Sequence, residues 1–162
     1  MQTPMFKNKE TLEASKSVIE DFQLHEQVGI GNFGRVIRAF NSRREREVAL
    51  KILPKENIAQ MKHSDHVVNE RESLAHLTEL CQMAEDEQDE SVDNRSRFVI
   101  KFFSSFQDSR NLYLELEYVK GCTLLSQVHS RNHAVQARAD FYAGEAILAL
   151  EYLHREQIVY RD

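Results

Sequence analysis

Three glycines constrain the fold of this chain more than any other feature. Gly29, Gly31 and Gly34 follow the spacing G-x-G-x-x-G. Because glycine has no Cβ, its backbone N–H group can approach phosphate oxygens closely. Its backbone can also adopt φ and ψ angles that other residues resist. The spacing alone is a weak signal, because unrelated folds use it.

The segment after the glycines distinguishes between these folds. A dinucleotide-binding fold begins a helix at the glycines. Here the glycines precede a short apolar run at Val36–Phe40, a polar turn at Asn41–Glu47 and a second apolar run at Val48–Leu53, which Pro54 ends. Such runs predict strands. We therefore expect the glycines to join two antiparallel strands with Lys51 on the next strand, which argues against a nicotinamide-dependent oxidoreductase.

Neither feature is decisive alone, since hairpin glycines often serve only the turn and strand lysines are often solvated. A second charged residue strengthens the case. The segment Lys62–Leu80 has a helical pattern, in which Glu70 shares a stripe with Val67, Leu74 and Leu77. A carboxylate on an apolar face needs a cation. We predict that Glu70 pairs with Lys51; the alternative is a surface pair within the helix, with His66.

The rest of the chain completes an α+β fold. The first strand is predicted at Phe22–Val28, a fourth at Phe98–Phe103 that ends near Phe106, and a fifth at Leu112–Val119. The sheet would have five antiparallel strands and one helix. On the fifth strand, alternation predicts that the buried face carries Leu112, Leu114 and Leu116.

Two further helices are predicted near the end of the chain. Thr123 would cap a short helix at Thr123–Arg131, and Ala134–Arg155 would form a helix so apolar that it belongs in a core. The acidic segment Met83–Arg97 is interpreted as a solvated insertion, the alternative being a docking tract for a basic partner. Residues 1–21 are taken as an extension, with a short surface helix around Glu10–Asp21.

Composition excludes several classes. The 162 residues are 41% hydrophobic and 29% charged with a net charge of −5, so nucleic acid is not expected as a partner. No apolar run is long enough to cross a bilayer, no signal-peptide pattern opens the chain, and Gln2 does not match the N-myristoylation pattern, which needs glycine at that position. Cys81 and Cys122 are too few for a disulfide framework or a zinc site. We expect an intracellular protein, cytoplasmic and also nuclear, with no membrane partner.

The combined motifs resemble a known family. They are Gly-Ile-Gly-Asn-Phe-Gly-Arg-Val, Val-Ala-Leu-Lys-Ile-Leu, Val-Asn-Glu, Asn-Leu-Tyr-Leu-Glu-Leu-Glu-Tyr-Val, and Glu-Tyr-Leu-His followed by Ile-Val-Tyr-Arg-Asp. From Phe22 to Asp162 the chain resembles the N-terminal half of eukaryotic protein kinase domains. Within these it is most similar to the AGC group and to catalytic subunits of cyclic-AMP-dependent kinases. The resemblance implies a small lobe at residues 22–119, interrupted by the acidic insertion at 83–97, and the first helices of a truncated large lobe at 120–162.

The resemblance also implies a role for each matching residue in a serine/threonine kinase that uses ATP and Mg²⁺. Asp162 would accept the substrate hydroxyl proton, while Lys51 and Glu70 would form the phosphate-binding ion pair. His66 and Arg161 would contact a phosphorylated activation loop. The implied cofactor-binding residues are the glycine loop (Val28, Gly29, Ile30, Gly31, Asn32, Phe33, Gly34, Arg35 and Val36), the adenine-packing Ala49, the gatekeeper Leu116, the hinge residues Glu117 and Val119, and Thr123.

The chain departs from this family in two places. Thr123, after Gly121-Cys122, stands where the group usually has a glutamate for the ribose hydroxyls. The sequence also stops at Asp162, before the catalytic-loop asparagine, the Asp-Phe-Gly metal ligand and the activation loop. We therefore assign no metal ligand, and we expect the 162 residues alone to fold poorly, to bind ATP weakly at best and not to transfer phosphate at a useful rate.

Two functional hypotheses remain at this point. In the first, the chain is part of a serine/threonine kinase that phosphorylates proteins, with a cyclic-AMP-binding regulatory subunit as a partner. In the second, it is a non-catalytic module that binds a nucleotide or a protein. The presence of all three glycines together with Lys51, Glu70 and Asp162 favours the first.

Overall fold

The computed structural model describes residues 17–61, 64–86, 98–129 and 137–160. The chain divides into two compact units, each described here by itself. Unit 1 comprises Met1–Thr78 and Lys101–Tyr118, and unit 2 comprises Glu79–Ile100 and Val119–Asp162. A long helix, α2 (Ser64–Asp86), contributes residues to both units.

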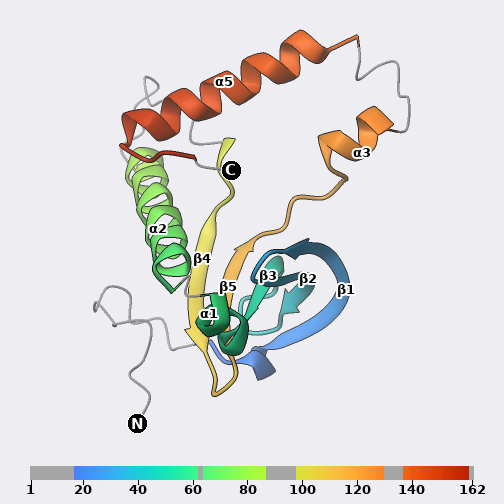
Figure 1. Ribbon diagram of the computed structural model, residues 1–162, viewed down its shortest axis with the longest axis vertical. Helices are drawn as coiled ribbons and strands as arrows, with labels where there is room; N and C mark the ends of the chain where they lie inside the picture. Colours follow the sequence, from blue (N-terminus) through green and yellow to red (C-terminus); the bar gives the residue numbers. More distant parts are fainter. Residues whose placement is uncertain (1–16, 62–63, 87–97, 130–136, 161–162) are drawn as a thin grey trace. The chain divides into compact units, whose positions relative to one another are not determined.

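Unit 1 is built on a five-stranded antiparallel sheet (Figure 1). The strands lie in the order β1-β2-β3-β5-β4, so the last two exchange places relative to the sequence. Their bounds are Phe22–Gly31 (β1), Gly34–Asn41 (β2), Arg46–Pro54 (β3), Phe102–Gln107 (β4) and Asn111–Glu117 (β5). The predicted α+β class and five antiparallel strands are confirmed.

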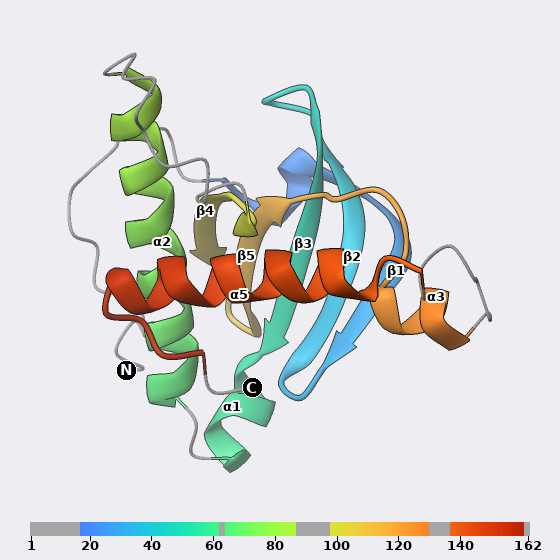
Figure 2. The ribbon, with the colours of Figure 1, turned by 90° about the horizontal axis from the view of Figure 1, so that it is seen from above.

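The helical segments follow the predictions in part. Besides α2 they are the 3-10 turn η1 (Ile19–Asp21), α1 (Lys55–Met61), α3 (Leu124–His129) and α5 (Ala139–Arg155), and Figure 2 shows them from a second side. The sequence did not predict α1, which begins directly after Pro54 and buries Ile58 fully. The helix α2 extends past the predicted end at Leu80, so the first residues of the acidic segment are helical, while residues 87–97 lie outside the described part.

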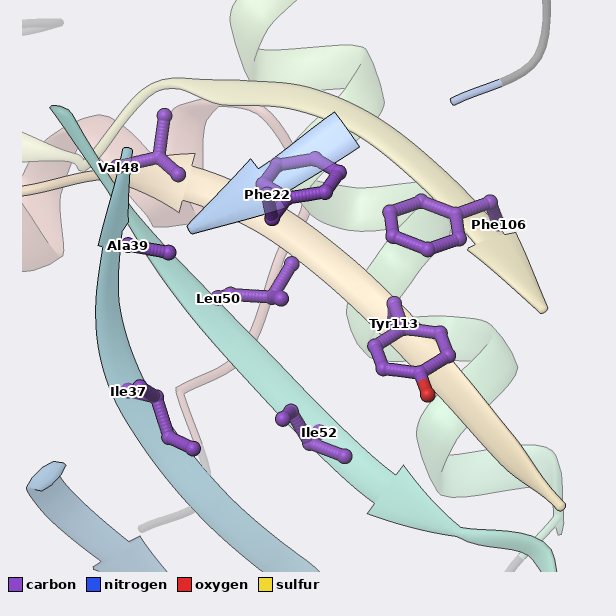
Figure 3. Packing of buried hydrophobic residues seen from close by; sticks show 8 residues of the cluster. All are labelled: Phe22, Ile37, Ala39, Val48, Leu50, Ile52, Phe106 and Tyr113. Carbon is purple, nitrogen blue, oxygen red and sulfur yellow. The ribbon is translucent and has the colours of Figure 1, made fainter. Parts of the chain in front are cut away.

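One face of the sheet carries an aromatic core. The rings of Phe22, Phe106 and Tyr113 stack in series, with centroids 5.3 Å and 4.6 Å apart (Figure 3). Aliphatic side chains of β2 and β3, including Leu50, complete this cluster, and Ile19 packs against it. The segment just before β1 is therefore part of the folded unit. Only the turn at Ile19–Asp21 is helical there, and the rest of the helix predicted around Glu10–Asp21 lies largely outside the described residues.

The other face of the sheet packs against α2. Val67 of α2 is fully buried there and Leu74 packs at its margin. Leu77, the third residue of the predicted apolar stripe, is also buried. The three leucines predicted on the buried face of the fifth strand, Leu112, Leu114 and Leu116, belong to the same cluster.

The predicted start of the fourth strand at Phe98 is wrong. Phe98 and Val99 lie in a turn, Ile100 is 40% exposed, and β4 begins only at Phe102. The apolar run alone could not locate this start, because the end of a strand leaves a weaker sequence signal than its interior. On β5 the other face is buried as well, because Tyr113 is nearly and Glu115 fully buried.

In unit 2, α5 lies against the C-terminal part of α2 through Tyr152, which is buried and close to Cys81. Phe141 is 56% and Ile147 65% exposed, so within the described residues α5 is not the buried core helix predicted at Ala134–Arg155. No helix among the described residues is long and apolar enough to span a membrane. Both cysteines are free.

Candidate functional site

The glycine loop joins two paired strands. β1 ends at Gly31 and β2 begins at Gly34, so Asn32 and Phe33 form a two-residue turn. In the antiparallel register Gly29 lies opposite Val36 and Gly31 opposite Gly34. The prediction that a strand, rather than a helix, follows the glycines is confirmed.

The glycines differ in what the fold itself requires. A Cβ on Gly34 would collide with the carbonyl oxygen of Ile52 on β3, so only glycine fits there. A Cβ on Gly29 or Gly31 would come no closer than 3.6 Å and 3.9 Å to its neighbours, which is ordinary van der Waals contact. The fold therefore does not demand glycine at these two positions. Their bare backbone suits a ligand that approaches it closely, as a polyphosphate does.

Lys51 and Glu70 form the predicted ion pair. Lys51 lies on β3 opposite Val36 of the glycine hairpin and Leu114 of β5. Its Nζ donates a hydrogen bond to Oε1 of Glu70 on α2 at 2.5 Å. The two side chains are 20% and 37% exposed, so the pair is accessible from outside the core. An ammonium carries three N–H groups and can bind an anion while paired with Glu70.

The residues predicted to contact adenine gather on the same face of the sheet. Ala49 and Leu116 are buried in the cluster beneath α2, and Phe33 and Val36 pack against it. Ala49 and Leu116 lie opposite each other on β3 and β5. The structure thus brings the loop turn, two strands and the ion pair together within unit 1.

The two predicted hinge residues, Glu117 and Val119, fall in different units of the chain. The backbone N–H of Glu117 donates to the Lys101 carbonyl at 2.9 Å, so that amide is already used. Val119 and Thr123 belong to unit 2 and are described only within it. There the Oγ1 of Thr123 accepts the backbone N–H of Ser126 at 3.1 Å, which confirms Thr123 as the cap of α3. The predicted catalytic residue Asp162, together with Arg161, lies outside the described residues.

Sequence reasoning missed a charged cluster on the same face. Arg38 lies opposite Ala49 and binds Glu26 of β1 at 3.0 Å as well as Glu47 of β3. Its guanidinium carbon is 5.5 Å from the centre of the Tyr118 ring. The pairing of β1 with β2 shifts between Leu24 and Gln27, so a bulge brings Glu26 to Arg38. Side-chain hydrogen bonds to Glu47 and Glu26 raise the pKa of Arg38. A one-residue slip of this kind leaves no periodic signal in the sequence.

Two further features bear on ligands. No group of three or more histidine, cysteine or acidic side chains in the described ranges could hold a metal ion. An open groove of about 490 Å³ lies behind the glycine loop, lined by Ile52 and Tyr113 among others. These two residues belong to the aromatic core, so this groove lies on the sheet face opposite Lys51 and is not the phosphate site.

Comparison with protein families gives a match. The model described as "Protein kinase domain" matches residues 22–162. The match includes the glycine loop, the ion pair and Asp162.

Curated relatives agree with this match. "cAMP-dependent protein kinase type 3" of Saccharomyces cerevisiae is 32% identical over 162 residues, which are 100% of this chain and 36% of that protein. The "cAMP-dependent protein kinase catalytic subunit" of Schizosaccharomyces pombe is 33% identical over 89% of this chain and 25% of its own length. "Serine/threonine-protein kinase sgk-1" of Caenorhabditis elegans is 31% identical, over 93% and 29%. The chain therefore spans about a quarter to a third of these relatives.

Proposed function

Because this chain belongs to the protein kinase domain family, we propose that it is the ATP-binding part of a serine/threonine protein kinase. The whole enzyme would transfer the γ-phosphate of ATP to serine and threonine hydroxyls of proteins. The observation that carries this proposal is the ion pair between Lys51 and Glu70, 2.5 Å apart and accessible beside the glycine hairpin.

Each part of the site then has a role toward ATP. Lys51 would neutralise charge on the α- and β-phosphates, and Glu70 would hold its ammonium in place. Backbone N–H groups of the glycine loop would lie over the phosphates, with close approach at Gly29 and Gly31. Val36, Ala49 and Leu116 would contact the adenine ring through apolar surface.

The remaining roles rest on the sequence match. Asp162 would accept the proton of the attacking hydroxyl. Mg²⁺ supplies charge neutralisation on the β- and γ-phosphates in this family, and none of the 162 residues is assigned to it. We therefore propose that these residues by themselves bind ATP without transferring its phosphate. The hydroxyl of Thr123 would serve the ribose without the charge of a glutamate.

The partners follow from the family and the relatives. A protein substrate is implied by the reaction itself. Relatives named as cyclic-AMP-dependent kinases suggest a cyclic-AMP-binding regulatory subunit, although a relative named as another serine/threonine kinase matches nearly as well. We also propose a cytoplasmic and nuclear location.

The test is a calorimetric titration of ATP into the protein and two lysine variants. Lys51→Met should weaken binding by about 10- to 100-fold, because a charge-assisted hydrogen bond contributes about 1.5–3 kcal/mol. Lys55→Met is the matched control. It removes the same charge from unit 1, where Lys55 Nζ donates to the Asp108 carbonyl at 2.6 Å, and it should leave ATP affinity unchanged.

Equal affinities in all three proteins would contradict the proposed role of Lys51. Transfer of labelled phosphate to a serine-containing protein substrate by the full-length protein would distinguish an enzyme from a non-catalytic binding module. Binding without transfer by that protein would support the module.

A further inference from the structure

Glu115 is a buried carboxylate for which the proposed function has no use. It is fully buried in β5, between two residues that face the candidate site. Leu114 lies opposite Lys51, and Leu116 lies opposite Ala49. Since successive side chains of a strand alternate between faces, the Glu115 carboxylate lies on the face away from the site.

Polar groups from three other strands and one turn converge on this carboxylate. Asn41, at the end of β2, donates from Nδ2 to Oε1 at 2.8 Å, and Ser104 of β4 donates from Oγ to Oε2 at 2.6 Å. The guanidinium groups of Arg44 and Arg46 lie 3.7 Å and 3.6 Å from its oxygens. Glu115 therefore connects β2, the turn before β3, the start of β3, and β4.

The contacts coincide with two irregular points of the sheet. The pairing of β4 with β5 shifts between Phe102 and Ser104, which leaves Phe103 as a bulge. Arg46 lies over the Phe103 ring, 3.6 Å from its centre. At the other end of the network, Asn41 Oδ1 accepts the backbone N–H groups of Arg43 and Arg44 and so closes the turn. Glu115 thus holds both the bulge and the turn.

A buried polar network of this kind contributes little net stability, but it can fix the positions of the strands that it joins. Replacing every member of a buried ion cluster by apolar residues is often neutral or stabilising, whereas removing one member is destabilising, because the other charges are left unpaired. A buried polar group can instead fix the register of its element. In a strand, register decides which residues face the site.

We propose that Glu115 is a positioning residue for the adenine end of the site. It fixes β5 against the bulge of β4 and the turn after β2, and thereby places Leu116 and the backbone of Glu117. This inference rests on the proposed ATP site. It adds that adenine recognition and phosphate recognition are positioned separately, by Glu115 and by the Lys51–Glu70 pair.

The experiment compares Glu115→Val with the control Glu56→Gln, which removes an exposed carboxylate from α1. Affinities of the full-length protein are measured for ATP and for inorganic tripolyphosphate, together with the thermal midpoint and the hydrogen exchange of the Leu116 and Glu117 amides. Glu115→Val should bind ATP about fivefold more weakly and tripolyphosphate unchanged, with a lower midpoint, because Arg44 and Arg46 lose their common carboxylate partner. The two amides should exchange about tenfold faster, while the control should match the wild type.

A merely structural role would weaken the binding of ATP and of tripolyphosphate by the same factor, and that result would overturn the proposal, as would unchanged ATP affinity and amide exchange. Should Glu115→Val not fold, Glu115→Gln, which keeps the shape but not the charge, is held to the same criteria. If the wild type binds neither ligand, the proposed function fails. In that case only the hydrogen exchange of the Leu116 and Glu117 amides tests the role of Glu115. Faster exchange in Glu115→Val would support the positioning role, and unchanged exchange would overturn it.

Discussion

At the scale of single residues, the loop glycines are required for different reasons. The fold requires glycine at position 34, whereas at position 31 we attribute the glycine to ligand binding. Gly34→Ala would place a Cβ against the backbone of Ile52, and such overpacking costs about 1–3 kcal/mol of unfolding free energy. Gly31→Ala meets no close neighbour and should change the unfolding free energy by less than about 0.5 kcal/mol while weakening ATP binding. Urea unfolding and ATP titration check both; equal stability of the two variants would contradict this assignment.

The residues that sequence reasoning placed correctly are those with a chemical reason for their position. Glu70 interrupts an apolar stripe, so it had to find a cation, and Lys51 is that cation. Glu115 and Arg38 were not predicted as part of a charged cluster, because each stands in a strand where polar and apolar residues alternate as usual. Their partners meet only where strands shift register, at bulges that the sequence does not mark.

At the scale of elements, the contact between α2 and α5 predicts a response to alkaline pH. Burial, followed by the neighbouring Cys81 and Glu156, raises the pKa of Tyr152 to about 12. An unfolded tyrosine has a pKa of about 10. Tyr152 therefore contributes stability that is fully present below about pH 10 and is lost as pH rises through about 12, with a slope approaching 1.4 kcal/mol per pH unit.

Tyr152→Phe tests this contact through chemical unfolding between pH 8 and 12. The variant should lose stability less steeply than the wild type above about pH 10. Below that pH the two curves should run parallel, which serves as the internal control. Parallel curves over the whole range would show that Tyr152 is not buried as described.

Whole strands and helices were easier to predict than their ends. The glycine hairpin and the leucines of β5 carry strong local signals, and both are confirmed. The short α1 was missed because the tertiary packing of Ile58 decides it, and the start of β4 was missed because strand ends leave a weaker sequence signal than strand interiors. For the same reason, the apolar content of α5 predicted burial that the described residues of unit 2 do not show.

At the scale of the molecule, the two units differ in how much core they hold. Unit 1 has two apolar clusters, one on each face of its sheet, whereas Cys81 and Tyr152 are the buried apolar residues described in unit 2. Local stability follows buried apolar contact. Hydrogen exchange on the 162 residues should protect β3 and β5 far more than α3 and α5. Equal protection across both units would contradict the prediction.

The most direct test of the central claim is a double-mutant cycle on ATP affinity. The claim is that Glu70 serves the nucleotide only by holding Lys51. Lys51→Met and Glu70→Gln should each weaken binding, and the double variant should bind no more weakly than Lys51→Met alone, which gives a coupling free energy of about 1–3 kcal/mol. Losses that simply add would show that the two residues act independently and would contradict the account.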